Sequence, residues 1–149
     1  MKGVAVAMLT TERVQHKEQL EKAYRIRTEV FVEEQGVPVE AEIDEHENAS
    51  SHVLISYDGE PAGTGRVRVV DGVAKLERIC VREKFRKHQI GKAVMEALEA
   101  IAREQGLSKA KLHAQTQAAG FYERVGYKTD SEVFMEENIP HVRMIKSLI

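Results

Sequence analysis

A basic turn leads into a helix near the middle of the sequence, and this combination can bind a phosphate group. The turn follows the strand-like segment Val73–Val81, and Gly91 lies where the apolar periodicity of a helix begins. Its cationic or titratable side chains are Arg82, Lys84, Arg86, Lys87, His88 and Lys92. The first N–H groups of a helix have no intrahelical partner and lie at the positive end of the helix dipole. The pattern predicts either a phosphate or pyrophosphate site or a solvated basic turn, and spacing alone does not choose between them.

A second group of charges is acidic and precedes the first strand-like hairpin. Its members are Glu33, Glu34, Glu40, Glu42, Asp44, Glu45 and Glu47. Such a stretch either attracts a cationic molecule or is a solvated acidic loop, and the loop is the commoner case. His46 and His52 lie close by, but their spacing fits no zinc motif, so we expect no metal site.

The glycines of Gly63-Thr64-Gly65 do not indicate a dinucleotide site. A strand-like segment follows them where the fingerprint needs a helix, and Arg68 occupies the position of the third glycine.

Periodicity predicts the elements that must position these side chains. Two Asp-Gly pairs, at Asp58 and Asp71, favour tight hairpin turns between three antiparallel strands. The predicted strands are Val4–Leu9, His52–Tyr57, Ala62–Val70, Val73–Val81 and Lys111–Gln115, with Tyr127–Met135 and His141–Leu148 as a closing pair around Pro140. The predicted helices are His16–Gly36, Gln89–Gly106 and Ala118–Val125, and Glu40–Ser51 is expected to be a loop. The fold class is therefore α/β (α+β), a mixed sheet with helices packed on it.

Composition narrows the functional classes. The chain has 149 residues with 22 Lys and Arg against 24 Asp and Glu, and this net charge of −2 gives no general attraction for nucleic acid or anionic lipid. Cys80 is the single cysteine, which fits a reducing compartment, and no apolar run reaches the ~20 residues of a membrane helix. We expect one cytoplasmic domain over residues 1–149 that does not bind nucleic acid or membranes.

Two motifs resemble the GNAT superfamily of acetyl-CoA-dependent N-acetyltransferases. Arg86–Gly91 resembles the R/Q-x-x-G-x-G/A element, and Gln115–Tyr127 is similar to the N-x-x-A-x-x-F/L-Y-x-x-x-G-F/Y element. The order and spacing of elements match over essentially the whole chain. Four further segments resemble the bacterial YjcF/ElaA-type subgroup, namely Val30–Gln35, Leu76–Cys80, His113–Gln117 and Ile139–His141. The sequence departs from the family at Gln89, which replaces the first glycine, and at Gln115, which replaces asparagine.

The resemblance implies a GNAT fold, a mostly antiparallel sheet with helices on both faces, that binds acetyl-CoA. It implies acetyl transfer to a primary amine of a small molecule or peptide by direct attack in a ternary complex. Family positions for coenzyme binding map to Ile79, Cys80, Val81, Arg86, Lys87, His88, Gln89, Ile90, Gly91, Lys92, Ala93, Gln115 and Tyr122. Tyr122 stands where family members place the hydroxyl that protonates the departing thiolate, although packing alone would also explain a tyrosine there.

The base that deprotonates the amine is left open among Glu34, Glu77, His113 and His141, with water-mediated deprotonation as a further alternative. Glu34 and His141 are also expected to contact the acceptor. An acyl-enzyme at Cys80 would need a lowered pKa or a nearby base, which its neighbours do not supply.

Two other functions are compatible with this pattern. Gln89 and Gln115 would suit a non-catalytic acyl-CoA-binding sensor or interaction module. The Arg27–Phe31 segment and the acidic stretch are also similar to those of acyl-homoserine-lactone synthases. Homodimerisation through the C-terminal strands is possible, and the acceptor amine is not identified by the sequence.

Overall fold

The Asp-Gly turns fold the middle of the chain into an antiparallel meander. We describe the fold from a computed structural model, over residues 8–149. Asp58 and Gly59 have φ of 48° and 84°, and Asp71 and Gly72 have φ of 51° and 76°, as a type I′ turn requires. The turns join β2 (Ser51–Tyr57), β3 (Glu60–Val70) and β4 (Val73–Val81), which confirms the three predicted strands.

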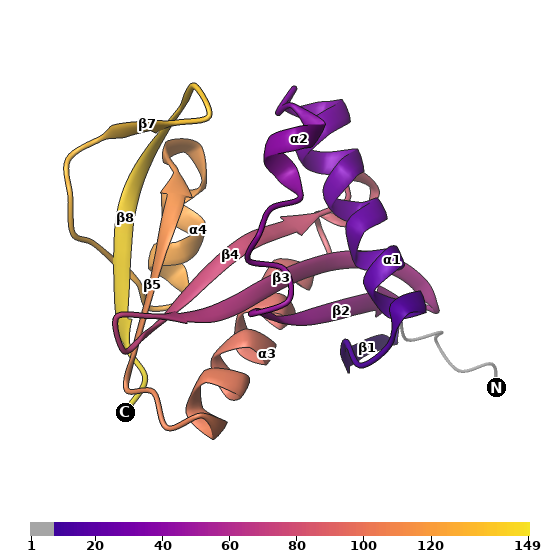
Figure 1. The fold of residues 1–149 in the computed structure, drawn as a ribbon, viewed down its shortest axis with the longest axis horizontal. Helices are drawn as coiled ribbons and strands as arrows, with labels where there is room; N and C mark the ends of the chain where they lie inside the picture. The colour runs from indigo at the N-terminus through magenta and orange to yellow at the C-terminus, as the bar shows by residue number, and fades with distance from the viewer. Residues whose placement is uncertain (1–7) are drawn as a thin grey trace, which may run out of the picture.

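These strands form the middle of an eight-stranded sheet with the order β1-β2-β3-β4-β5-β8-β6, and β7 pairs with β8 (Figure 1). The pairs are antiparallel except for β4 and β5, which run parallel. The remaining strands are β1 (Leu9–Arg13), β5 (Lys109–Gln115), β6 (Lys128–Thr129), β7 (Phe134–Glu136) and β8 (Ile139–Ser147).

Helices cover both faces of the sheet, as predicted. They are α1 (Lys17–Arg27), a π-helical turn (Thr28–Glu34), α2 (Val39–Glu42), α3 (Ile90–Glu104) and α4 (Ala119–Arg124), with 3-10 turns at Glu83–Phe85 and Thr116–Ala118. The alternation of β2 separates the faces, because Leu54 packs with Ile26 and Val30 on the α1 side. Val53 and Ile55 point the opposite way, into the larger core that α3 completes. In the described part of the chain, no helix is both long and apolar enough to cross a membrane.

Several predicted boundaries were wrong. The first helix does not continue as an α-helix to Gly36, since it changes to a π-helical turn after Arg27. The loop predicted from Glu40 begins with the single turn α2. Of the predicted strand Val4–Leu9, residues 4–7 lie outside the described residues, and the described strand starts at Leu9.

The closing strand pair also differs from the prediction. The segment 127–135 is not one strand, because Asp130 and Ser131 leave the sheet to hydrogen-bond Arg143 of β8. The hairpin turn is formed by Glu137 and Asn138, both at positive φ, and Pro140 lies inside β8.

Two glycines of β3 explain the Gly63-Thr64-Gly65 segment as a packing feature. An added Cβ at Gly63 would lie 2.7 Å from Cγ2 of Ile90, and one at Gly65 would lie 2.8 Å from Cγ1 of Val94. The absence of side chains therefore lets α3, which begins at the basic turn, lie directly on the sheet.

We expect Gly65→Ala to lower the free energy of unfolding by about 1–3 kcal/mol, because its methyl group overpacks the contact with Val94 and Leu98. Urea unfolding measures this effect. Gly120→Ala is the matched control, since its added Cβ meets nothing closer than 3.6 Å and alanine favours a helix. A Gly65→Ala protein as stable as the wild type would show that α3 does not depend on this close approach.

Candidate active site

The parallel strands β4 and β5 part halfway along their length. They pair only at Ala74, Lys75 and Leu76 of β4, and Figure 1 shows them diverging beyond that point. A β-bulge marks the separation, because Arg78 and Ile79 together oppose one residue of β3 and Arg78 has a φ of 55°. The end of β4 therefore presents backbone groups to an open space in place of a neighbouring strand.

The first cavity lies at the start of α3 and has a volume of about 620 Å³. Lys87, Gln89, Gly91 and Lys92 line it from the basic turn, and Arg124 contributes from α4. Among residues 8–149, neither lysine nor Arg124 makes an ion pair. Free cations beside the first N–H groups of a 15-residue helix fit a pyrophosphate.

The backbone at the helix start favours glycine at two positions. Gln89 is the N-cap of α3 and has a φ of 59° and a ψ of 25°, the left-handed conformation that glycine adopts most easily. Gly91 lies against Phe121, whose Cζ would be 3.1 Å from an added Cβ. The glutamine keeps the left-handed geometry that the family motif implies.

Other residues predicted for the coenzyme make contacts within the protein. Arg86 is held by Glu34 through two hydrogen bonds of 2.7 Å and donates to the backbone of Val81 at 2.9 Å. The Arg86 guanidinium lowers the pKa of Glu34, so this predicted acceptor residue is an ionised partner of the turn. His88 packs on the Tyr57 ring, with centroids 4.4 Å apart. Ile90 is buried in the core, and Ala93 packs against it.

A second cavity, of about 670 Å³, adjoins the first. Six residues line both cavities: Ile79, Cys80, Val81, Arg86, Ala118 and Tyr122. The two cavities therefore adjoin at the end of β4 and at Tyr122.

Tyr122 comes from α4 and is only 8% exposed. Its ring meets Phe121 and Tyr127 edge-on. Burial raises the pKa of Tyr122, so the phenol keeps its proton at neutral pH. Within the described chain it makes no hydrogen bond, and the proton remains available to a bound molecule.

Cys80 lies on the opposite face of β4 from the larger core, packed with Ile26, Val30 and Leu54. Burial raises the pKa of the Cys80 thiol well above its usual value. A thiol without its negative charge is a poor nucleophile, and this site is therefore unsuited to an acyl-cysteine.

We expect Cys80→Ala to retain kcat within about threefold, because direct attack does not use the thiol. Steady-state thiol release measures kcat, and mass spectrometry of the protein after mixing with acetyl-CoA tests for a covalent acetyl group. A folded variant without activity, together with an acetylated Cys80 in the wild type, would contradict direct transfer.

Part of the acidic stretch is solvated as predicted, since Glu33, Glu40 and Glu45 are exposed, but Glu42, Asp44 and Glu47 are paired with arginines. Arg27, which is 1% exposed, binds Glu42 at 3.0 Å and Glu47 at 2.7 Å. Arg66, equally buried, binds Asp44 at 2.8 Å and reaches Glu47 at 2.9 Å. Arg27 at the end of α1 and Arg66 of β3 therefore attach α2 and the loop after it to the helix and to the sheet, which accounts for the three buried or partly buried carboxylates.

Glu77 belongs to the same network. Burial opposes its ionisation, but the hydrogen bond from Arg68 and the charges of Arg66 and Lys75 lower the pKa of Glu77 to about 2. A carboxylate that remains ionised down to this pH is a weak base for an ammonium group.

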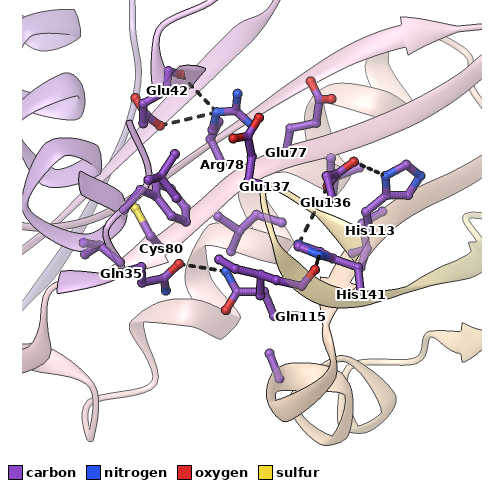
Figure 2. A pocket seen from close by; sticks show the side chains of 18 of the residues that line it. Gln35, Glu42, Glu77, Arg78, Cys80, His113, Gln115, Glu136, Glu137 and His141 are labelled. Carbon is purple, nitrogen blue, oxygen red and sulfur yellow. Dashed lines mark hydrogen bonds and ion pairs between the residues drawn. The ribbon is translucent and has the colours of Figure 1, made fainter. Parts of the chain in front are cut away.

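The far wall of the second cavity joins two predicted histidines through a carboxylate that sequence reasoning missed (Figure 2). Glu136 of β7 is 3.0 Å from Nδ1 of His113 and 3.7 Å from Nε2 of His141. The hydrogen bond with His113 lowers the pKa of Glu136, which is therefore ionised. No motif distinguished this residue, because its position depends on the pairing of the three-residue strand β7 with β8.

Gln115 also lies in the second cavity. Its side-chain amide donates to Oε1 of Gln35 at 2.8 Å, which links β5 to the residue that follows the π-helical turn. Gln115 therefore lines the second cavity and not the cavity at the start of α3.

Comparison with known proteins agrees with this architecture. The sequence profile of the acetyltransferase (GNAT) domain family matches residues 10–148. The N-acetyltransferase YjcF of Bacillus subtilis is 50% identical over 133 residues, which cover 88% of this chain and 94% of the relative.

Two solved structures extend the agreement to three dimensions. A Lactobacillus plantarum protein superposes with a TM-score of 0.87 at 27% identity, covering 95% of this chain and 99% of that one. Escherichia coli ElaA gives a TM-score of 0.81 at 25% identity, covering 93% and 99%. The predicted fold and subgroup are therefore confirmed, and the chain belongs to the GNAT acetyltransferase family as an N-acetyltransferase.

Proposed function

We propose that this enzyme transfers an acetyl group from acetyl-CoA to a primary amine of a small molecule or peptide, by direct attack while both are bound. The observation that carries the proposal is the pair of cavities sharing one wall at the end of β4 and at Tyr122. Two compartments that open onto a common wall allow a donor and an acceptor to be bound together, so no covalent enzyme intermediate is needed.

The residues of the first cavity suit the coenzyme. Lys87, Lys92 and Arg124, with the start of α3, would hold its pyrophosphate, and the end of β4 would bind its pantetheine arm as an added strand. Acetyl-CoA supplies a thioester whose carbonyl carbon accepts the amine. A backbone N–H of β4 would stabilise the negative charge that develops on that carbonyl oxygen.

Tyr122 completes the proposed reaction. Its protonated hydroxyl, at the boundary of both cavities, would give a proton to the departing thiolate. The larger cavity would hold the acceptor between β4 and the β7–β8 hairpin.

The test has two measurements. Calorimetry measures acetyl-CoA binding to the wild type and to Lys92→Glu, in which we expect weaker binding. Thiol release is then followed with spermidine, glucosamine, lysine and a dipeptide as acceptors. Binding of acetyl-CoA with no acceleration by any amine in a broad panel would support the acyl-CoA sensor, and absence of binding would contradict both functions.

A further inference from the structure

The hydrogen bonds of His141 fix which of its ring nitrogens carries the proton. Nδ1 lies 2.7 Å from the carbonyl oxygen of Ile139, and a carbonyl oxygen can only accept. In the neutral ring, Nδ1 is therefore the donor and Nε2 carries a lone pair. The side chain is 9% exposed and stacks on Phe134, so its orientation is held by packing.

This lone pair faces a second acceptor. Nε2 of His141 lies 3.7 Å from Oε2 of Glu136, beyond hydrogen-bond distance, while the other carboxylate oxygen is occupied by His113 at 3.0 Å. Both atoms are hydrogen-bond acceptors, so they repel each other unless a donor group or a proton lies between them. An ammonium group can supply N–H bonds to both, and its positive charge complements the ionised carboxylate.

We propose that Glu136 and Nε2 of His141 form the acceptor-amine site, in which Glu136 binds the ammonium group and His141 is the base that deprotonates it. This inference rests on the proposed acetyl transfer and adds to it the residue that prepares the nucleophile. His113 is a positioning residue, since it holds Glu136 through Nδ1.

The proton balance is as follows. One N–H bond of the ammonium group breaks, its proton goes to Nε2 of His141, and the freed electron pair forms the C–N bond as the C–S bond breaks. The amine loses a second proton as the amide forms. His141 releases one proton to solvent, and the other restores Tyr122 after its own proton has gone to the thiolate.

The surroundings of His141 include several other charges. The titratable or charged groups that line the cavity with it are Glu136, Glu137, His113, Lys75, Glu77, Arg78, Arg86, Cys80, Tyr122, Glu42 and Asp44. Glu77 is neutralised by Arg66, Arg68 and Lys75, and Arg78 binds Asp44 at 3.1 Å. Glu137 also lines the cavity, but Glu136 is the carboxylate that lies beside Nε2, with Oε2 at 3.7 Å, and only its other oxygen is hydrogen-bonded to His113.

His141→Asn is the sharpest variant, because an asparagine amide can still donate to the Ile139 carbonyl while the Nε2 base is removed. We expect kcat/KM for the amine to fall about 10²-fold at pH 7, with the Kd of acetyl-CoA unchanged. Without the base, the variant can acetylate only amine molecules that have already lost their proton in solution. Its kcat/KM should therefore rise about tenfold per pH unit towards the pKa of the amine, while the wild-type profile is flatter. Its deficit should therefore shrink as the pH rises.

His113→Asn is the matched control. The asparagine amide can still donate to Glu136, while the other ring nitrogen is removed. We expect the pH profile of the wild type and a loss of kcat/KM for the amine of less than tenfold. Glu136→Gln should raise KM for the amine more than it lowers kcat, since it removes the charge that binds the ammonium group. A His141→Asn enzyme with the wild-type pH profile would overturn the assignment.

Nitrogen NMR of the histidine rings tests the site without turnover or a variant. We expect His141 in the Nδ1–H form, with its Nε2 signal shifted by n-butylammonium and not by 1-butanol. An Nε2–H form, or no response to the ammonium probe, would contradict the proposal. If no amine is acetylated but the NMR response is present, the proposed transfer fails while the ammonium site stands.

Discussion

Replacing Tyr122 with phenylalanine is expected to lower kcat about 10²-fold, the usual contribution of a positioned general acid. The Kd of acetyl-CoA should change less than about twofold, because the ring and its edge-on contacts with Phe121 and Tyr127 are retained. Burial raises the pKa of the Tyr122 hydroxyl, so the wild-type group is a proton donor throughout the neutral pH range. Single-turnover and steady-state thiol release together measure the loss.

Tyr127→Phe is the control for this prediction. Tyr127 is also buried in the aromatic cluster, but its hydroxyl donates to Oε2 of Glu99 at 2.9 Å and does not line either cavity. Removing it should cost about 1–3 kcal/mol of stability, because a buried carboxylate loses a donor, and should leave kcat close to the wild-type value. Equal losses of kcat in the two variants would mean that Tyr122 acts through packing.

The two walls of the larger cavity divide the chemistry. In the proposed reaction, the end of β4 and Tyr122 of α4 act on the thioester and the leaving thiolate, whereas Glu136 and His141 of the β7–β8 hairpin face the incoming amine. Glu136 comes from β7 and His141 from the start of β8, where β8 pairs with β7 on one side and with Gln115 of β5 on the other, so one short hairpin would supply both proposed acceptor residues. Variation of this hairpin can therefore change the acceptor while the coenzyme side is kept.

Local sequence rules predicted the parts of the fold that depend on near neighbours. The turns at Asp58 and Asp71 were predicted because Asp-Gly pairs adopt positive φ easily. The helix within Gln89–Gly106 was predicted because its apolar residues fall on one face. The helix start after the basic turn was predicted in the same way, and the structure places Gly91 against Phe121.

The side chains that line the larger cavity could not be predicted from such local rules. The acidic residues between Glu42 and Glu47 were interpreted as solvated or as a field for the acceptor, because their partners Arg27 and Arg66 are far away in the sequence. Glu136 meets His113 only because β7 and β5 both pair with β8. Such contacts depend on strand register, which a single sequence does not specify.

The largest expected effect on stability comes from the ion network, at Arg66. Its guanidinium, 1% exposed, contacts three carboxylates: Asp44 at 2.8 Å, Glu47 at 2.9 Å and Glu77 at 2.9 Å. Arg66→Met would leave these charges buried with fewer partners, and removing one partner from a buried ion pair costs about 3–5 kcal/mol. We expect urea unfolding at pH 7 to show a loss of this size.

Arg143→Met is the matched control. Arg143 also pairs with an aspartate, Asp130, at 2.9 Å, but both side chains are nearly half exposed and the pair is screened by water. The same substitution there should have little effect. Losses of similar size at both sites would show that the Arg66 network adds nothing beyond a surface ion pair.

Acid provides an independent check on the same residues. Although burial opposes ionisation, the arginines lower the pKa of Glu47 to about 2, and Glu77 is lowered to about 2 by its own cationic partners. An unfolded glutamate titrates near 4.5, so the stability that these lowered pKa values contribute is fully present above that pH. It is lost as the pH falls towards 2. Without the Arg66 guanidinium, the pKa values of Glu47 and Glu77 in the folded protein rise. The variant therefore loses less unfolding free energy than the wild type as the pH falls. The difference in unfolding free energy between wild type and Arg66→Met should therefore narrow from pH 5 to pH 3, and a constant difference would mean that the cost arises from packing and not from charge.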